Sequence, residues 1–180
     1  PSVVRYPRSA GRGIVLPTPI EPMLGPWIDV VQEGKDVLIL GVGPEVHVAM
    51  EAAHDLLNQG VSATVAAVTR VRPLDTEALL TLVRRHRGVV TVEDNVLAGG
   101  FGSEVLEALA DNGESIAVKR AGLPDEFVRH GPVATLRRDV GLTADQVALA
   151  ALAVGISRAA LDYSIAYAKD RDVFGVKVAQ

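Results

Sequence analysis

The chain has 180 residues, 48% of them hydrophobic, which is enough for one well-packed core and a possible appendage. Its 18 basic and 22 acidic residues give a net charge of −4 and are mixed along the sequence, which excludes a charged stripe for nucleic acid or an anionic membrane. Cysteine is absent, which excludes disulfides and sulfur-ligated metals, so we expect a cytoplasmic protein. We find no continuous apolar run of about 18 residues and no signal-peptide layout, and we expect no membrane partner. A chain that starts with proline is expected to begin inside a longer polypeptide.

Residues 1–34 are expected to form an arm or linker. Proline and glycine are dense here and disfavour long helices and central strands. They stand at Pro7, Gly11, Gly13, Pro17, Pro19, Pro22, Gly25 and Pro26.

Short apolar runs alternate with helical patterns over residues 35–150. Strands are predicted at 36–41, 61–69 and 89–92, and a weaker one at 115–119, which is polar enough to be an edge strand or to run antiparallel. Helices are predicted at 45–58, 75–87 and 103–111, between glycine, proline and aspartate boundaries. This alternation predicts an α/β domain of three layers, a mostly parallel sheet with helices on both faces.

A separate tail begins at Thr143, where a capping-box spacing opens a long stretch with few helix breakers. We expect one helix over about 143–169, roughly 40 Å long at 1.5 Å per residue, that is too long for the domain to cover. Its apolar stripe should therefore favour self-association unless the helix folds back at Gly155. The stripe consists of Val147, Leu152, Ile156, Ala159, Ala160, Tyr163, Ala166 and Tyr167. We assign residues 35–150 to the α/β domain and 151–180 to the tail.

Two glycine-containing connections are candidate ligand sites. The turn 41–44 could hold a phosphate at a helix start, but Val46 replaces the third glycine of a dinucleotide fingerprint, which favours an ordinary tight turn. Glu93, Asp94 and Asn95 follow a strand and precede the glycine-rich segment 99–103. This connection falls where α/β sheets bind ligands, and the alternative is that its acidic residues cap and orient the loop.

The histidines predict no metal centre and no catalytic group. His47, His54 and His86 lie in helical patterns without metal-ligand spacing. His130 could titrate near neutrality, but no nucleophile accompanies it in the sequence, which favours a structural role.

Several motifs in register resemble the last domain of the 1-deoxy-D-xylulose-5-phosphate synthase family over about residues 1–150. The motifs are Arg5-Tyr6-Pro7-Arg8, Arg72-Pro73-Leu74-Asp75, Val92-Glu93-Asp94 with Gly99-Gly100-Phe101-Gly102-Ser103, and Gly122-Leu123-Pro124-Asp125 with Phe127 and His130-Gly131. The resemblance implies a transketolase C-terminal-like fold in a thiamine-diphosphate- and magnesium-dependent transferase. Such an enzyme joins pyruvate to glyceraldehyde 3-phosphate for isoprenoid synthesis.

The same resemblance implies that Arg8 binds the substrate phosphate and that the domain contributes contacts to a homodimer. The diphosphate and magnesium segment and the activating glutamate belong to other domains of the family, so no catalytic residue is assigned and Glu93 is not that glutamate. The fragment is therefore expected to bind no cofactor alone, and its partners are the remaining domains of the synthase.

The tail is similar to a helix of the acyl-CoA dehydrogenase family over about residues 153–180. The similarity rests on Gly155–Tyr163 and on Tyr167-Ala168-Lys169-Asp170-Arg171 with Phe174-Gly175. It implies that Arg171 and Phe174 contact a flavin if the tail belongs to a complete dehydrogenase. A natural fusion, an engineered chimera and a misassembled reading frame stay open, as does a standalone binding or oligomerisation module.

Overall fold

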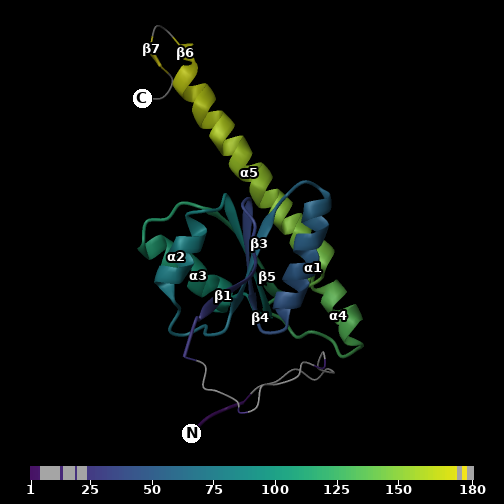
Figure 1. The fold of residues 1–180 in the computed structure, drawn as a ribbon. Coiled ribbons are helices and arrows are strands. Elements are labelled where there is room, and N and C mark those ends of the chain that lie inside the picture. The colour runs from purple at the N-terminus through teal and green to yellow at the C-terminus, as the bar shows by residue number, and fades with distance from the viewer. Residues whose placement is uncertain (5–12, 14–18, 20–23, 174–175, 178–180) are drawn as a thin grey trace.

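The computed structural model describes residues 1–4, 13, 19, 24–173 and 176–177 (Figure 1). The main sheet has five strands in the order β1-β3-β2-β4-β5. The strands are β1 (Ile28–Gln32), β2 (Val37–Val42), β3 (Ala63–Val68), β4 (Gly88–Val96) and β5 (Ala117–Leu123). The helices are α1 (Glu45–Asn58), α2 (Thr76–Val83), α3 (Phe101–Asp111), α4 (Val133–Asp139) and α5 (Ala144–Asp170). A two-stranded antiparallel ladder, β6 (Asp172–Val173) with β7 (Val176–Lys177), follows α5.

The predicted three-layer arrangement is confirmed. Side chains alternate along β2, so that Ile39 packs into a core with α1 and α5 while Leu38 and Leu40 pack into a second core with α2 and α3. Both faces of the sheet are thus covered, as the continuous apolar runs of the strands require (Figure 1).

Four of the five strands are parallel, and β1 is the exception. It pairs antiparallel with β3, with Ile28 opposite Val68, and forms one edge of the sheet. These residues lie within the segment 1–34 that was expected to be an arm or linker, and no strand was predicted there. The strand nevertheless alternates between buried and exposed residues, the pattern of a half-covered edge. At the other edge, β5 runs parallel to β4 and continues to Leu123, beyond the predicted end at 119.

The predicted helix over 75–87 is wrong at its end, because α2 stops at Val83. Asp75 caps the start by accepting the backbone N–H of Ala78 at 3.1 Å, as expected. After Val83 the chain tightens into turns, and His86 enters the interior, where its ring bonds Thr64 Oγ1 and the carbonyl of Leu82, each at 2.7 Å. The turns bring the chain directly to the start of β4.

The predicted long helix is confirmed as α5, which is unbroken at Gly155. Its first turns pack against the domain through Val147, Ala148, Ala151 and Val154, so the buried part extends past residue 150. Beyond them the helix projects away from the sheet (Figure 1), and Ile156 and Tyr163 are 70% and 74% exposed. By length and composition the segment Val133–Asp170 could cross a membrane, but this test is weak because core helices of soluble proteins also pass it.

Candidate functional site

The sequence motifs meet at the carboxyl edge of the sheet, by which we mean the ends of β2 to β5 and the connections that follow them. Parallel strands bring these ends together. Because β1 is antiparallel, its first residue also lies at this edge, next to the end of β3. Trp27 fixes the chain there: its carbonyl accepts the Thr69 N–H at 3.0 Å, and the Arg70 guanidinium lies 4.0 Å from its ring centroid.

The connection from β2 to α1 is a tight turn that ends in a buried carboxylate. Gly43 has a φ of +60°, which favours glycine, and its carbonyl accepts the N–H of Val46 at 3.3 Å. The first residue of α1, Glu45, has a fully buried side chain that forms an ion pair with Arg137 of α4. An added phosphate would meet the negative charge of Glu45, so the geometry supports the tight-turn interpretation.

Glu45 and Arg137 form a two-pronged ion pair. Arg137 Nη1 donates to Glu45 Oε2 at 3.0 Å, and Nη2 donates to Oε1. Burial raises the pKa of the Glu45 carboxyl, Arg137 opposes this by hydrogen bonding and charge, and the nearby Asp94 raises it further. Sequence reasoning missed this pair, because no local pattern connects residues 92 positions apart.

Glu93 is the second buried carboxylate of the edge, and it caps α3. Its side chain accepts the backbone N–H of Phe101 at 2.7 Å and that of Gly102 at 2.8 Å. A carboxylate suits this place because the first N–H groups of a helix lack partners and its N-terminus is positively polarised. The capping interpretation of the acidic segment therefore holds for Glu93, which lies in the irregular last part of β4.

The glycines of segment 99–103 allow this close approach. A Cβ on Gly100 would lie 2.4 Å from Glu93 Oε2, and a Cβ on Gly102 would lie 2.6 Å from Thr91 Oγ1. Both positions therefore require the backbone to pass directly over side chains of β4. The glycine-rich loop serves packing rather than a bound phosphate.

Arg120 holds the remainder of the β4–α3 loop. Its Nη1 donates to the carbonyl of Leu97 and to Ser103 Oγ, both at 2.8 Å. Ser103 Oγ donates to the same carbonyl at 2.8 Å. The loop at the carboxyl edge is thus fixed from β4, β5 and α3 together.

The predicted residues after β5 lie on the surface. Residues 125–130 are all exposed, Phe127 completely so, and His130 makes no side-chain hydrogen bond to a described residue.

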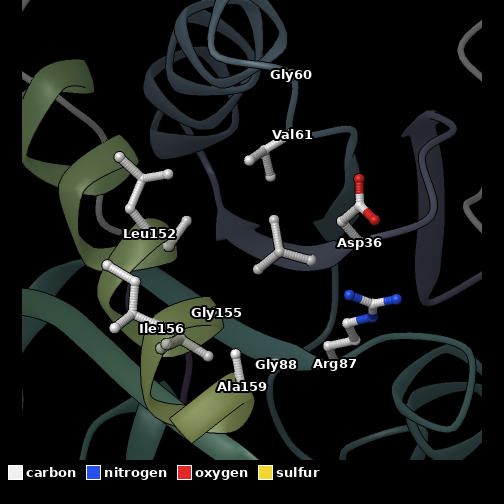
Figure 2. A pocket seen from close by; sticks show the side chains of 12 residues that line it. Asp36, Gly60, Val61, Arg87, Gly88, Leu152, Gly155, Ile156 and Ala159 are labelled. Carbon is white, nitrogen blue, oxygen red and sulfur yellow. The ribbon is translucent and has the colours of Figure 1, made fainter.

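A cavity of about 360 Å³ lies at the opposite, amino edge of the sheet, away from the motifs. Figure 2 shows Leu152, Ile156 and Ala159 of α5 on one side, and Asp36 and Arg87 on the other. Asp36 is already engaged, since its Oδ2 accepts the N–H of Ser62 at 2.8 Å.

The described residues do not fit a site for thiamine diphosphate with magnesium. They contain no group of three or more histidine or acidic side chains arranged for a metal ion. The oxygens of Glu45 and Glu93 are occupied by Arg137 and by the start of α3. His86 is a structural hydrogen-bonding group in the core.

Arg8 and Phe174 lie outside the described residues. Arg171 is exposed at the end of α5, where it contacts Tyr167 through the hydroxyl and, at 5.4 Å, through the ring. The end of α5 projects away from the sheet (Figure 1), and Arg171 does not line the cavity beside α5 that contains Asp36 and Arg87.

Comparison with known proteins agrees with this architecture. The 1-deoxy-D-xylulose-5-phosphate synthase of Heliobacterium modesticaldum is 44% identical over 148 residues, which are 82% of this chain and 23% of that protein. 1-Deoxy-D-xylulose-5-phosphate synthase 1 of Geobacter sulfurreducens is 44% identical over 151 residues, or 83% and 24%. The chain thus spans about a quarter of the length of these curated relatives.

A solved structure described as "Split gene transketolase, inactive beta4 tetramer" superimposes with a TM-score of 0.70 and 32% identity. The match covers 78% of this chain and 47% of that one. A family model described as "Transketolase, C-terminal domain" matches residues 28–147, which is more than half of the chain. The chain belongs to the family of transketolase C-terminal domains.

Proposed function

We propose that this chain is the C-terminal domain of a cytoplasmic, thiamine-diphosphate-dependent 1-deoxy-D-xylulose-5-phosphate synthase. In this role it contributes dimer contacts and the substrate-phosphate arginine Arg8, while other domains hold the cofactor and magnesium. The observation that carries the proposal is the 44% identity to two synthases over more than four fifths of the chain.

The arrangement of the carboxyl edge supports a docking role rather than chemistry. Its two buried carboxylates are engaged in ion pairing and helix capping, and its surface presents Phe127. The part of the arm before β1 joins the domain at the same edge through Trp27. An arginine on the arm is suited to phosphate, because the planar guanidinium donates two parallel hydrogen bonds.

A domain exchange tests the proposal. The C-terminal domain of the Heliobacterium modesticaldum synthase is replaced by residues 1–157 of this chain, which keep the buried turns of α5, and product formation from pyruvate and glyceraldehyde 3-phosphate is measured. We expect activity within about tenfold of the parent enzyme and none in a version without the domain. A hybrid that is dimeric, folded and inactive contradicts the proposal.

Arg8 is tested in the same hybrid. Arg8→Ala should raise KM for glyceraldehyde 3-phosphate by roughly 10²-fold, the loss expected for a charged hydrogen bond of about 3 kcal/mol, with KM for pyruvate little changed. Arg5→Ala, in the same segment, is the matched control and should leave both constants near the parent values. Equal effects of the two variants contradict the role of Arg8.

The exposed half of α5 supports a second candidate, an oligomerisation module. Ile156, Tyr163 and Tyr167 are 70%, 74% and 49% exposed, which is unusual for a monomer. Light scattering of the full chain and of a version ending at Ser157, which keeps the buried turns of α5, measures the contribution of this half. A higher mass for the full chain at micromolar concentration supports the module, and equal masses exclude it. The flavin-contacting role of Arg171 and Phe174 stays a proposal for a chimera with a complete dehydrogenase bundle.

A further inference from the structure

The segment between β5 and α5, residues 124–139, is attached to the domain in an unusual way; we call it the strap. None of its residues is buried, although it lies beside α1 at the carboxyl edge (Figure 1). The backbone hydrogen bonds of its residues all stay within the strap and the turn that follows α4.

A two-pronged side-chain contact joins the strap to α1. Arg137 reaches the first turn of α1 and places both prongs of its guanidinium on the two oxygens of Glu45. Leu136 is only partly buried, and a Cβ on Gly131, within the strap itself, would lie 3.4 Å from Leu136 Cδ2. The next firm apolar anchor is Leu142, which is 2% exposed and lies after the strap.

We propose that the Glu45–Arg137 ion pair is a latch that holds the strap against the carboxyl edge and releases it when the solution is acidified. The pair is suited to this task because its carboxylate is fully buried while the guanidinium is 28% exposed and can move into water. Release does not require the domain to unfold, because the strap buries no residue of its own.

The surroundings of Glu45 set the direction of the switch. Arg137 from α4 stabilises its charged form, whereas burial and Asp94 at the end of β4 disfavour it. No charged group of α5, which also packs on α1, acts on Glu45 among the described residues. The carboxyl therefore takes up its proton above its ordinary range, and the neutral acid then holds Arg137 by a weaker, uncharged hydrogen bond.

Nuclear magnetic resonance relaxation of the full chain tests the latch. At pH 7.5 the backbone order parameters of residues 133–139 should be near the rigid value of about 0.85, and on acidification they should fall below about 0.6. The midpoint should lie above pH 4.5, the ordinary Glu pKa, while amides of α1 and β2 stay ordered.

Variants separate the latch from a general effect of acid. Glu45→Gln mimics the neutral acid and should give low order parameters in the strap already at pH 7.5, with no midpoint. Arg138→Gln is the matched control on the same helix and should behave as the parent chain. His130→Gln removes the imidazole of the strap and should leave the midpoint in place.

If Glu45→Gln does not fold, Arg137→Gln tests the latch instead, because loss of the guanidinium should also lower the order parameters of the strap at pH 7.5. A strap that stays rigid in a folded Glu45→Gln or Arg137→Gln variant overturns the proposal. So does a parent strap that stays rigid through the acid titration while the domain remains folded. These readouts do not depend on enzymatic activity, so they are independent of the proposed synthase role.

Discussion

At the scale of single residues, two buried carboxylates organise the carboxyl edge by different means. Glu93 accepts hydrogen bonds from the backbone amides at the start of α3, whereas Glu45 forms an ion pair with the side chain of Arg137. The first arrangement is local to one connection and rigid. The second joins two distant segments and depends on ionisation.

Replacing Glu93 tests the local arrangement. Glu93→Gln leaves one amide N–H of α3 facing a side-chain NH₂ group, so the free energy of unfolding should fall by about 1–3 kcal/mol. Urea unfolding measures this change. Glu107→Gln, an exposed position on the same helix, should change stability by less than about 0.5 kcal/mol. A Glu93 variant as stable as the Glu107 variant contradicts the capping role.

The raised pKa of Glu45 predicts a pH dependence of stability. In the unfolded chain the carboxyl ionises at its ordinary pKa, but in the folded chain ionisation is disfavoured by burial. The stabilising contribution of this group is therefore complete below about pH 4.5 and is lost as pH rises through the folded pKa. The unfolding free energy of the parent chain minus that of Glu45→Gln should fall between pH 4 and 7.5. A difference that rises with pH contradicts this sign.

The role of Glu93 could be predicted from the sequence, but the ion pair of Glu45 could not. The capping role of Glu93 was among the interpretations because its loop and the helix start are adjacent in the chain. Glu45 and Arg137 are 92 residues apart, and only the packing of α4 beside α1 brings them together. Their residue types alone carry no sign of this proximity.

At the scale of elements, the parallel core was predictable and the edge was not. Continuous apolar runs identify β2, β3 and β4 because these strands are buried on both faces. The five residues of β1 instead alternate between buried and exposed positions. They directly follow a proline-rich segment, and this segment led to the prediction of an arm without a strand. The end of α2 was missed because the turns that lead His86 inward depend on its tertiary partner Thr64.

The docking of α5 depends on the smallest residue of β4. A Cβ on Gly88 would lie 1.9 Å from Val154 Cγ1, so Gly88→Ala should lower the free energy of unfolding by about 1–3 kcal/mol through overpacking. Combining it with Val154→Ala should recover part of this loss, a coupling of about 0.5–3 kcal/mol in a double-mutant cycle.

Gly155 is the control for that substitution. Nothing lies within 4 Å of an added Cβ there, and the residue is within a helix. Gly155→Ala should therefore stabilise the chain by about 0.5–1 kcal/mol. If the Gly88 and Gly155 variants change stability equally in thermal unfolding, close packing of α5 on β4 is not the cause.

At the scale of the whole molecule, the sheet separates two different surfaces. Fixed loops, the strap and the start of β1 lie at the carboxyl edge, and the cavity beside α5 lies at the amino edge. This layout supports the proposed docking of the domain through its carboxyl edge.

The isolated chain should form no product from pyruvate and glyceraldehyde 3-phosphate with thiamine diphosphate and magnesium supplied. The two buried carboxylates at its motif-bearing edge, Glu45 and Glu93, are already engaged, and thiamine catalysis requires preorganised ligands for diphosphate and metal. It should likewise not oxidise acyl-CoA with added flavin. Chromatographic detection of product, with the Heliobacterium modesticaldum synthase as the positive control, checks this. Product above a no-protein blank contradicts the prediction.

The reversed direction of β1 decides where any group carried by the arm can act. Because Trp27 is held at the carboxyl edge by Thr69 and Arg70, any group attached before it is tethered to that edge. Encounters there become intramolecular, with effective concentrations that reach about the millimolar range for short connections and fall as the connection lengthens. A parallel β1 would have placed this tether at the amino edge beside α5. Strand polarity alone therefore fixes the attachment point of the preceding chain at the carboxyl edge, even though β1 adds only five residues to the sheet.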